Sequence, residues 1–276
     1  MRGRHFRTTL VCTSLISCLA TIRSFSAELG APQDVVFRAR HDGSEQRYVI
    51  QLPADFNAEQ PHPLLVALHG HGSDRWQFVR NPRDECRAAR EAAARHRCIY
   101  VSPDYRATTS WMGPAATADL VQILDELKRR HRVSRVIISG GSMGGTSALA
   151  FAALHPELVD GVVSLNGTAN MVEYGGFAEA ITAAYAGTKS ENPEVYRERS
   201  AELFPERLTM PIAITTGGQD TLVPPASCLR LAELLKARER PVLIIHRPEG
   251  GHSTNLADAA AALEYVIDRV LHAAPR

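Results

Sequence analysis

The sequence has almost no excess of charge of either sign. Its 31 basic and 30 acidic side chains leave a formal net charge of +1, so the chain has no overall field to recruit nucleic acid or an anionic membrane surface. The basic run at residues 128–130 falls at the end of a predicted helix, where cations offset the negative end of the helix dipole. We therefore expect no nucleic-acid partner.

Cysteine is scarce, with five residues in the whole chain. Removal of an N-terminal leader, described below, would leave Cys86, Cys98 and Cys228. An odd number of cysteines cannot form a complete disulfide framework, and no pair has the spacing of a zinc motif. One bridge between Cys86 and Cys98 is conceivable, but in a chain of this size we expect three small buried hydrophobic side chains.

No apolar run is long enough to span a bilayer comfortably. The N-terminal one, at residues 9–22, follows three arginines and precedes small residues at 24, 26 and 27, which is the order of a signal peptide. Cleavage after Ser26 fits the small-residue positions slightly better than cleavage after Ala27, which would leave bulky Phe25 near the cut. We predict a signal peptide at 1–26 and an exported protein, periplasmic or extracellular.

Two alternatives remain open for this leader. Leu15-Ile16-Ser17-Cys18 resembles a bacterial lipoprotein box, in which Cys18 would carry a lipid anchor. The other alternative is an apolar N-terminus that is not cleaved. Apart from a lipid anchor, we expect no integral association with a membrane.

What the chain does contain is an alternation of short apolar runs with longer amphipathic stretches, which predicts an α/β fold with a mostly parallel sheet. At 276 residues with 45% apolar content it can bury one substantial core, and we expect one domain at 27–276. The first two strands are joined by a turn near His41 and form an antiparallel hairpin at the edge. We predict eight strands, at 35–38, 48–52, 64–68, 99–102, 136–139, 161–164, 212–215 and 242–246, and flanking helices at 81–95, 115–131, 143–154, 226–238 and 255–270.

One segment interrupts the alternation. Between the sixth and seventh strands, residues 166–208 hold several glycines and two helical pieces, at 177–185 and 193–203. A structureless stretch of this length would be unusual in a compact domain. We therefore predict a small lid-like insertion or an ordered side wall.

A sharp strand-to-helix turn is predicted around Ser142. The run Gly140-Gly141-Ser142-Met143-Gly144 follows an apolar strand and precedes an Ala- and Leu-rich helix, which is the setting of the G-x-S-x-G motif. There the glycines let the backbones approach closely and the serine hydroxyl projects above the sheet. This context indicates a nucleophile at Ser142, against the alternative of an ordinary serine in a glycine-rich turn.

A serine hydroxyl needs a base within hydrogen-bond reach and a carboxylate that orients that base. Asp220 follows the seventh strand, and His252 follows the eighth, so both belong at the same carboxyl edge of the sheet as Ser142. The alternatives are a helix-capping role for Asp220 and a solvated loop position for His252. The other acids considered, Asp104 and Asp119, do not follow the seventh strand.

The negatively charged oxygen formed in such a reaction must meet preorganised donors, usually backbone N–H groups. The loop His69-Gly70-His71-Gly72 after the third strand can supply one donor, and Met143 can supply another. We predict His71 as the loop donor and Gly72 as its alternate. A metal site formed by His69 and His71 is the competing interpretation, but no third ligand has recognisable spacing, and no metal is expected.

An aromatic residue lies on the loop after the fourth strand. Trp111 is placed near the carboxyl edge of the sheet, where it could line the acyl or alcohol pocket. The alternative is that its ring packs under the insertion. The sequence leaves both open.

Together these motifs resemble the α/β-hydrolase superfamily, and within it the secreted esterases related to polyhydroxybutyrate depolymerases, feruloyl and acetyl-xylan esterases, and the catalytic domain of prolyl oligopeptidases. The resemblance covers roughly residues 48–270. It implies the α/β-hydrolase fold, a catalytic triad of Ser142, Asp220 and His252, and an oxyanion loop at 69–72. No propeller domain precedes this region, which makes a peptidase the weaker expectation.

The predicted function is therefore that of a serine hydrolase, most specifically a carboxylesterase acting on small or carbohydrate-linked esters through an acyl-enzyme, without a cofactor. Two enzyme alternatives use the same triad, a serine peptidase of the prolyl oligopeptidase type and an acyltransferase. A non-catalytic binding protein with a hydrolase fold is the alternative from another class, although such proteins typically lose a member of the triad.

Overall fold

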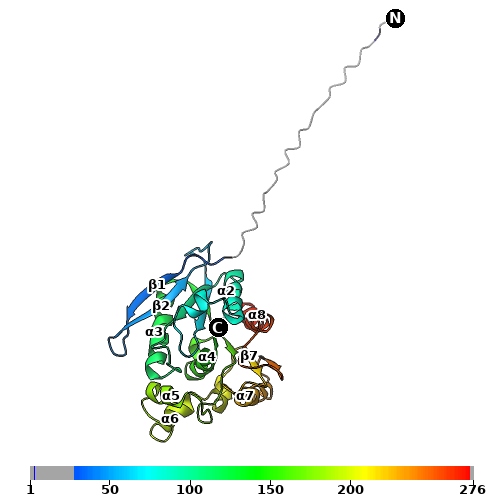
Figure 1. Ribbon diagram of the computed structural model, residues 1–276. Coiled ribbons are helices and arrows are strands. Elements are labelled where there is room, and N and C mark those ends of the chain that lie inside the picture. The colour runs from blue at the N-terminus through cyan, green and yellow to red at the C-terminus, as the bar shows by residue number, and fades with distance from the viewer. Residues whose placement is uncertain (1–2, 4–27, 274–276) are drawn as a thin grey trace.

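The computed structural model describes Gly3 and residues 28–273 (Figure 1). Nearly all of the predicted leader at 1–26, including Cys18, lies outside the described residues, so signal cleavage and lipid attachment stay predictions. In the described part of the chain, no helix combines the length and the apolar character that a membrane crossing requires.

A single eight-stranded sheet runs through the described domain in the order β1-β2-β4-β3-β5-β6-β7-β8. β2 pairs antiparallel with both β1 and β4, and every other neighbouring pair is parallel. This confirms the predicted mostly parallel sheet and its antiparallel edge. The strands are β1 (Gln33–Arg38), β2 (Glu45–Gln51), β3 (His62–Leu68), β4 (Ile99–Pro103), β5 (Val133–Gly141), β6 (Gly161–Leu165), β7 (Ile212–Gly217) and β8 (Val242–Arg247).

Helices cover both faces of the sheet. Buried residues of α2 and α8 pack together on one face, and those of α3, α4 and α7 pack on the other; Figure 1 shows α2 beside α8. The α-helices are α1 (Gln77–Arg80), α2 (Asp84–Arg95), α3 (Pro114–Arg130), α4 (Met143–Leu154), α5 (Ala178–Ala184), α6 (Pro193–Glu198), α7 (Ala226–Lys236) and α8 (Leu256–His272), with short 3₁₀ helices at Pro156–Leu158, Ala201–Leu203 and Pro205–Arg207.

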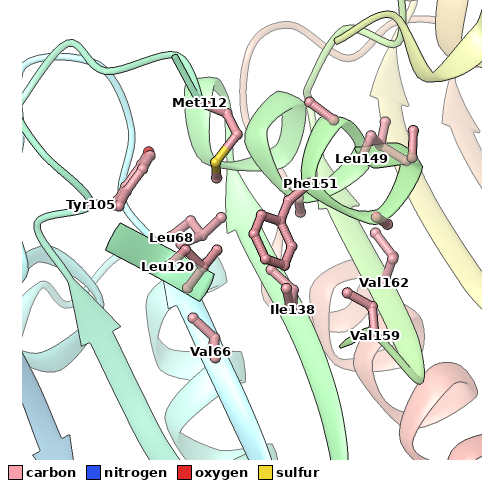
Figure 2. Packing of buried hydrophobic residues seen from close by; sticks show 14 of the residues in the cluster. Val66, Leu68, Tyr105, Met112, Leu120, Ile138, Leu149, Phe151, Val159 and Val162 are labelled. Atoms are coloured by element: carbon pink, nitrogen blue, oxygen red, sulfur yellow. The ribbon is translucent and has the colours of Figure 1, made fainter. Parts of the chain in front are cut away.

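The central strands are apolar throughout because both faces of the sheet are covered by helices. In β3, Leu64, Val66 and Leu68 pack on the α3 and α4 side, whereas Leu65 and Ala67 pack on the α2 and α8 side, as the period of two in a strand requires. Figure 2 shows the first of these cores, where β3 and β5 side chains meet α3 and α4. This core fixes the positions of the strand ends that carry the site.

One helix differs from the sequence prediction, whereas the three cysteines are buried as predicted. The predicted helix at 81–95 begins only at Asp84, as α2, because Asn81 before Pro82 is extended (ψ 133°); a residue before proline is disfavoured in the helical region. The short helix α1, which Asn81 ends, was not predicted. A Cys86–Cys98 bridge does not form. Both thiols and that of Cys228 are free and buried, and burial raises the pKa of each to about 12.

The segment between β6 and β7 is ordered and packed against the domain. Within it, the Tyr185 hydroxyl donates a hydrogen bond to the Trp111 carbonyl (2.9 Å), and Arg199 Nε donates to the Met112 carbonyl (2.6 Å). The Arg199 side chain is buried, as are Ile181 and Tyr196. These contacts favour the side-wall form of the predicted insertion at 166–208.

Candidate active site

Ser142 lies at a strained turn between β5 and α4. Its backbone adopts φ 58° and ψ −119°, a combination that L-residues rarely occupy and that marks functional sites. The glycines of the motif make this turn possible: a Cβ on Gly144 would lie 2.0 Å from the Leu68 carbonyl oxygen, and one on Gly140 would lie 2.5 Å from the Gly144 backbone. The predicted strand-to-helix turn is present.

The structure brings Ser142, His252 and Asp220 together. The Ser142 hydroxyl donates a hydrogen bond to His252 Nε2 (2.9 Å), and His252 Nδ1 donates to Asp220 Oδ2 (2.7 Å). These distances are within the range that an activated nucleophile requires. The arrangement can move a proton from the serine to the histidine while the carboxylate stabilises the imidazolium.

Backbone contacts hold Asp220 and its loop in place. Its Oδ1 accepts from the N–H groups of Leu222 (3.0 Å) and Val223 (2.9 Å), which leaves Oδ2 for His252. The side chain is almost fully buried. Close approach at Gly217, where a Cβ would lie 2.3 Å from the Gly251 carbonyl oxygen, joins this loop to the one that carries His252.

The predicted oxyanion donors flank the serine from two elements. Met143 is the first residue of α4, where backbone N–H groups have no partner within the helix. Among the described residues, nothing accepts a hydrogen bond from the His71 N–H. The predicted alternate, Gly72, is wrong, because its N–H donates to the Thr108 carbonyl (2.8 Å) and is already used.

The interpretation of Trp111 as a pocket residue also needs correction. The side chain is fully buried, and within the described part of the chain it does not line the cavity at Ser142. Its ring instead packs against Tyr174 (centroids 5.5 Å apart) and Phe177 (5.3 Å), both in the insertion. The alternative, packing under the insertion, is the correct one, because positive φ angles at Trp111 (43°) and Met112 (55°) turn this loop into the core.

Buried Trp111 nevertheless contacts both predicted oxyanion donors. Its indole N–H donates to His71 Nδ1 (3.1 Å), and its backbone N–H donates to Met143 Sδ (3.4 Å). Because an indole nitrogen can only donate, His71 Nδ1 must act as the acceptor, and the neutral ring carries its proton on Nε2. Burial also lowers the pKa of His71, which favours this neutral form.

Replacing Trp111 with phenylalanine tests whether its hydrogen bond to His71 positions the oxyanion donors. The substitution keeps an aromatic ring and removes the indole N–H. We expect kcat for an ester substrate to fall about 10- to 100-fold with little change in KM, since loss of a whole oxyanion donor costs about 10² to 10³ and Trp111 acts only through those donors. Nitrogen-15 NMR of His71 should show that the pure Nε2–H tautomer is lost.

The matched control is Trp76→Phe, at the other tryptophan of the chain. Trp76 stacks with Arg80, and among the described residues its ring makes no hydrogen bond or ring contact with His71 or Met143. It should keep the wild-type kcat and the wild-type His71 signal. An unchanged kcat in Trp111→Phe would show that Trp111 contributes packing alone.

The residues that the sequence offered as alternative ligands or acids make other contacts in the structure. The ring nitrogens of His69 face the carbonyl oxygens of Gly70 (2.9 Å) and Asp104 (3.2 Å), so this ring does not combine with His71 as a metal pair. Asp104 pairs with Arg75 (3.0 Å). Asp119 pairs with Arg106 (2.8 Å), and burial raises the pKa of Asp119 to about 6.

A cavity of about 320 Å³ opens beside Ser142 and His252. Its lining includes residues to which the sequence assigned no role, namely Gln77 from α1, Arg83 and Glu85 at the start of α2, Phe177 just before α5, and Leu222 in the loop after β7. These residues belong to no short motif. Only the proximity of α1 and α2 to the serine, which the fold creates, identifies them.

Residues 105–270 match the family model described as the prolyl oligopeptidase family. A 1-acylglycerol-3-phosphate O-acyltransferase of Arabidopsis thaliana is 26% identical over 143 residues, 49% of this chain and 31% of that protein. Among solved structures, puromycin hydrolase superimposes with a TM-score of 0.72 at 21% identity, over 90% of this chain and 40% of that one. FphF, a fluorophosphonate-binding serine hydrolase of Staphylococcus aureus, gives 0.66 at 18% identity, over 88% and 99% of the two chains.

The chain matches only part of two of these proteins. The chain spans 31% of the curated relative and 40% of puromycin hydrolase, and identities near one fifth establish a shared fold. That fold is the α/β-hydrolase fold with its eight-stranded, mostly parallel sheet.

Proposed function

The chain belongs to the prolyl oligopeptidase family, a family of serine hydrolases with the α/β-hydrolase fold, and from this premise we propose that it hydrolyses carboxylic esters through an acyl-enzyme on Ser142. The observation that carries the proposal is the continuous hydrogen-bond chain from Ser142 through His252 to buried Asp220 at the edge of a cavity. A chain of this kind activates a serine hydroxyl toward a carbonyl carbon.

The reaction proceeds in two halves. Ser142 Oγ attacks the ester carbonyl while His252 Nε2 accepts the hydroxyl proton, and Asp220 stabilises the imidazolium that results. The N–H groups of His71 and Met143 stabilise the negative oxygen of the tetrahedral intermediate. Collapse breaks the bond to the alcohol, which takes the proton from His252. Water, deprotonated by His252, then attacks the acyl carbonyl, and the acid leaves as His252 returns the proton to Ser142 Oγ.

The size of the cavity supports small esters. At about 320 Å³ it is at the lower end of the range for ligand pockets, roughly 300 to 1,000 Å³. A small acyl or alcohol group fits this space better than several residues of a peptide. The second candidate, a serine peptidase, is favoured by the family match, and an acyltransferase would use the same acyl-enzyme with a different acceptor.

Intact-mass labelling with a fluorophosphonate tests the proposal, followed by turnover of p-nitrophenyl esters of increasing chain length and of the matching p-nitroanilides. We expect one adduct on wild-type protein, none on Ser142→Ala, and ester turnover that exceeds anilide turnover and falls for long acyl chains. Faster anilide cleavage would assign the peptidase. Folded protein that forms no adduct would support the non-catalytic binding protein instead.

A further inference from the structure

The lining of the cavity beside Ser142 includes a group of polar side chains. Gln77, Arg83 and Glu85, from the α1 and α2 segment, contribute three of them. The same lining also holds apolar side chains, among them Phe177 and Leu222. The polar group is the part of the lining whose hydrogen-bonding capacity can be worked out residue by residue.

Gln77 presents a hydrogen-bond donor to the cavity. Its Oε1 accepts from the Gly70 N–H (2.7 Å), and because that backbone group can only donate, the orientation of the amide is fixed. The Nε2 group therefore faces away from this bond, and no acceptor for it lies within reach in the described residues. A free N–H pair at the cavity wall is an unused donor for a ligand oxygen.

Glu85 presents an acceptor beside the nucleophile. Its Cγ would lie 3.8 Å from a Cβ on Gly141, the residue before Ser142, and only 18% of its side chain is exposed. Its nearest charged group is Arg83, whose Nη1 is 4.0 Å away, beyond hydrogen-bond distance. Within the part of the chain that the structure describes, the carboxylate accepts no hydrogen bond, so its oxygens are available to a ligand in the cavity.

This combination of groups selects between ligand chemistries. An ammonium group would pair with Glu85 but would be repelled by Arg83 and could not use the N–H of Gln77. A carboxylate or phosphate would pair with Arg83 but would be repelled by Glu85. A neutral hydroxyl group is repelled by none of the three, because it can donate to Glu85 and accept from Gln77 or from Arg83.

From this we infer that Gln77, Arg83 and Glu85 form a subsite for the hydroxyl groups of the alcohol part of the substrate, as on a carbohydrate. This inference rests on the proposed ester hydrolysis and specifies its substrate class. The leaving alcohol is then a neutral polyol.

Three acetate esters test the subsite: the ester of a methyl glucoside, cyclohexylmethyl acetate, which has a similar ring without hydroxyl groups, and acetylcholine, which carries a cation. We expect the highest kcat/KM for the glucoside ester. Glu85→Leu should lower the ratio of glucoside-ester to cyclohexylmethyl-ester kcat/KM about 10- to 100-fold, the usual worth of a hydrogen bond to a charged group.

Gln77→Glu is the second variant and covers the case in which Glu85→Leu does not fold. It keeps an oxygen for the Gly70 N–H and replaces the donor with an acceptor, so the same ratio should fall about tenfold. The matched control is Glu91→Leu, on the same helix, where the carboxylate pairs with exposed Arg87 (2.7 Å). This control should leave the ratio at the wild-type value.

An unchanged ratio in both Glu85→Leu and Gln77→Glu would overturn the subsite while leaving ester hydrolysis in place. A preference for acetylcholine would also overturn it, because Glu85 would then act as a cation site. Wild-type protein that reacts with a fluorophosphonate but hydrolyses none of the three esters, nor any p-nitrophenyl ester, would overturn the proposed function and the subsite together.

Discussion

Replacing either Ser142 or His252 with alanine is expected to lower kcat for ester hydrolysis by about 10⁶. Ser142 Oγ lies 2.9 Å from His252 Nε2, so the serine hydroxyl is activated only while the histidine can accept its proton. Without Ser142 no acyl-enzyme forms, and without His252 the hydroxyl is a weak nucleophile near neutral pH. Initial rates with p-nitrophenyl acetate, corrected for the uncatalysed reaction, measure the effect.

The double variant distinguishes a catalytic pair from two independent residues. Because Ser142 and His252 act as one unit, the double alanine variant should be little slower than either single variant. The matched control is His246→Ala, a histidine in β8 whose Nδ1 contacts Thr216 Oγ1 (2.9 Å) rather than the serine. Near-wild-type activity in Ser142→Ala or His252→Ala, or loss in His246→Ala, would reassign the roles.

The sequence predicted the fold and the three residues of the hydrogen-bond chain because their signals are local. Ser142 directly follows β5, Asp220 lies in the loop after β7 and His252 in the loop after β8, and the parallel arrangement of these strands places the three strand ends at one edge of the sheet. The apolar runs locate the strands, and strand order then follows from few allowed connections. Little tertiary detail is needed for this level of prediction.

The other residues of the site could not be identified from the sequence, because their roles depend on contacts between segments far apart in the chain. Trp111 lies on the loop after a strand, but its ring is buried against Tyr174 and Phe177 of the insertion, which lie far along the chain. Gly72 cannot serve as an oxyanion donor, because its N–H donates to the carbonyl of Thr108 on another loop. Glu85 lies in the predicted helix at 81–95 and Gln77 precedes it, and their place in the lining of the cavity follows from the packing of α1 and α2 beside the serine.

Asp220→Asn is expected to lower kcat by about 10⁴ while leaving the fold intact. In the wild type, Oδ1 of Asp220 accepts from the Leu222 and Val223 N–H groups, and Oδ2 accepts from His252 Nδ1. An asparagine would keep its oxygen on the two backbone donors and turn its amino group toward His252. His252 Nδ1 would then have to accept, which moves the ring proton to Nε2.

The tautomer that results cannot accept the proton of Ser142, so the asparagine variant should be at least as slow as Asp220→Ala, although its shape is closer to that of the wild type. The measurement is kcat for p-nitrophenyl acetate together with proton NMR, in which the downfield Nδ1–H signal of His252 should disappear. Asp104→Asn, at an acid that pairs with Arg75, is the control and should keep both the signal and the rate. An asparagine variant within tenfold of the wild-type rate would mean that Asp220 does not determine the tautomer of His252, and that the histidine is oriented by its loop alone.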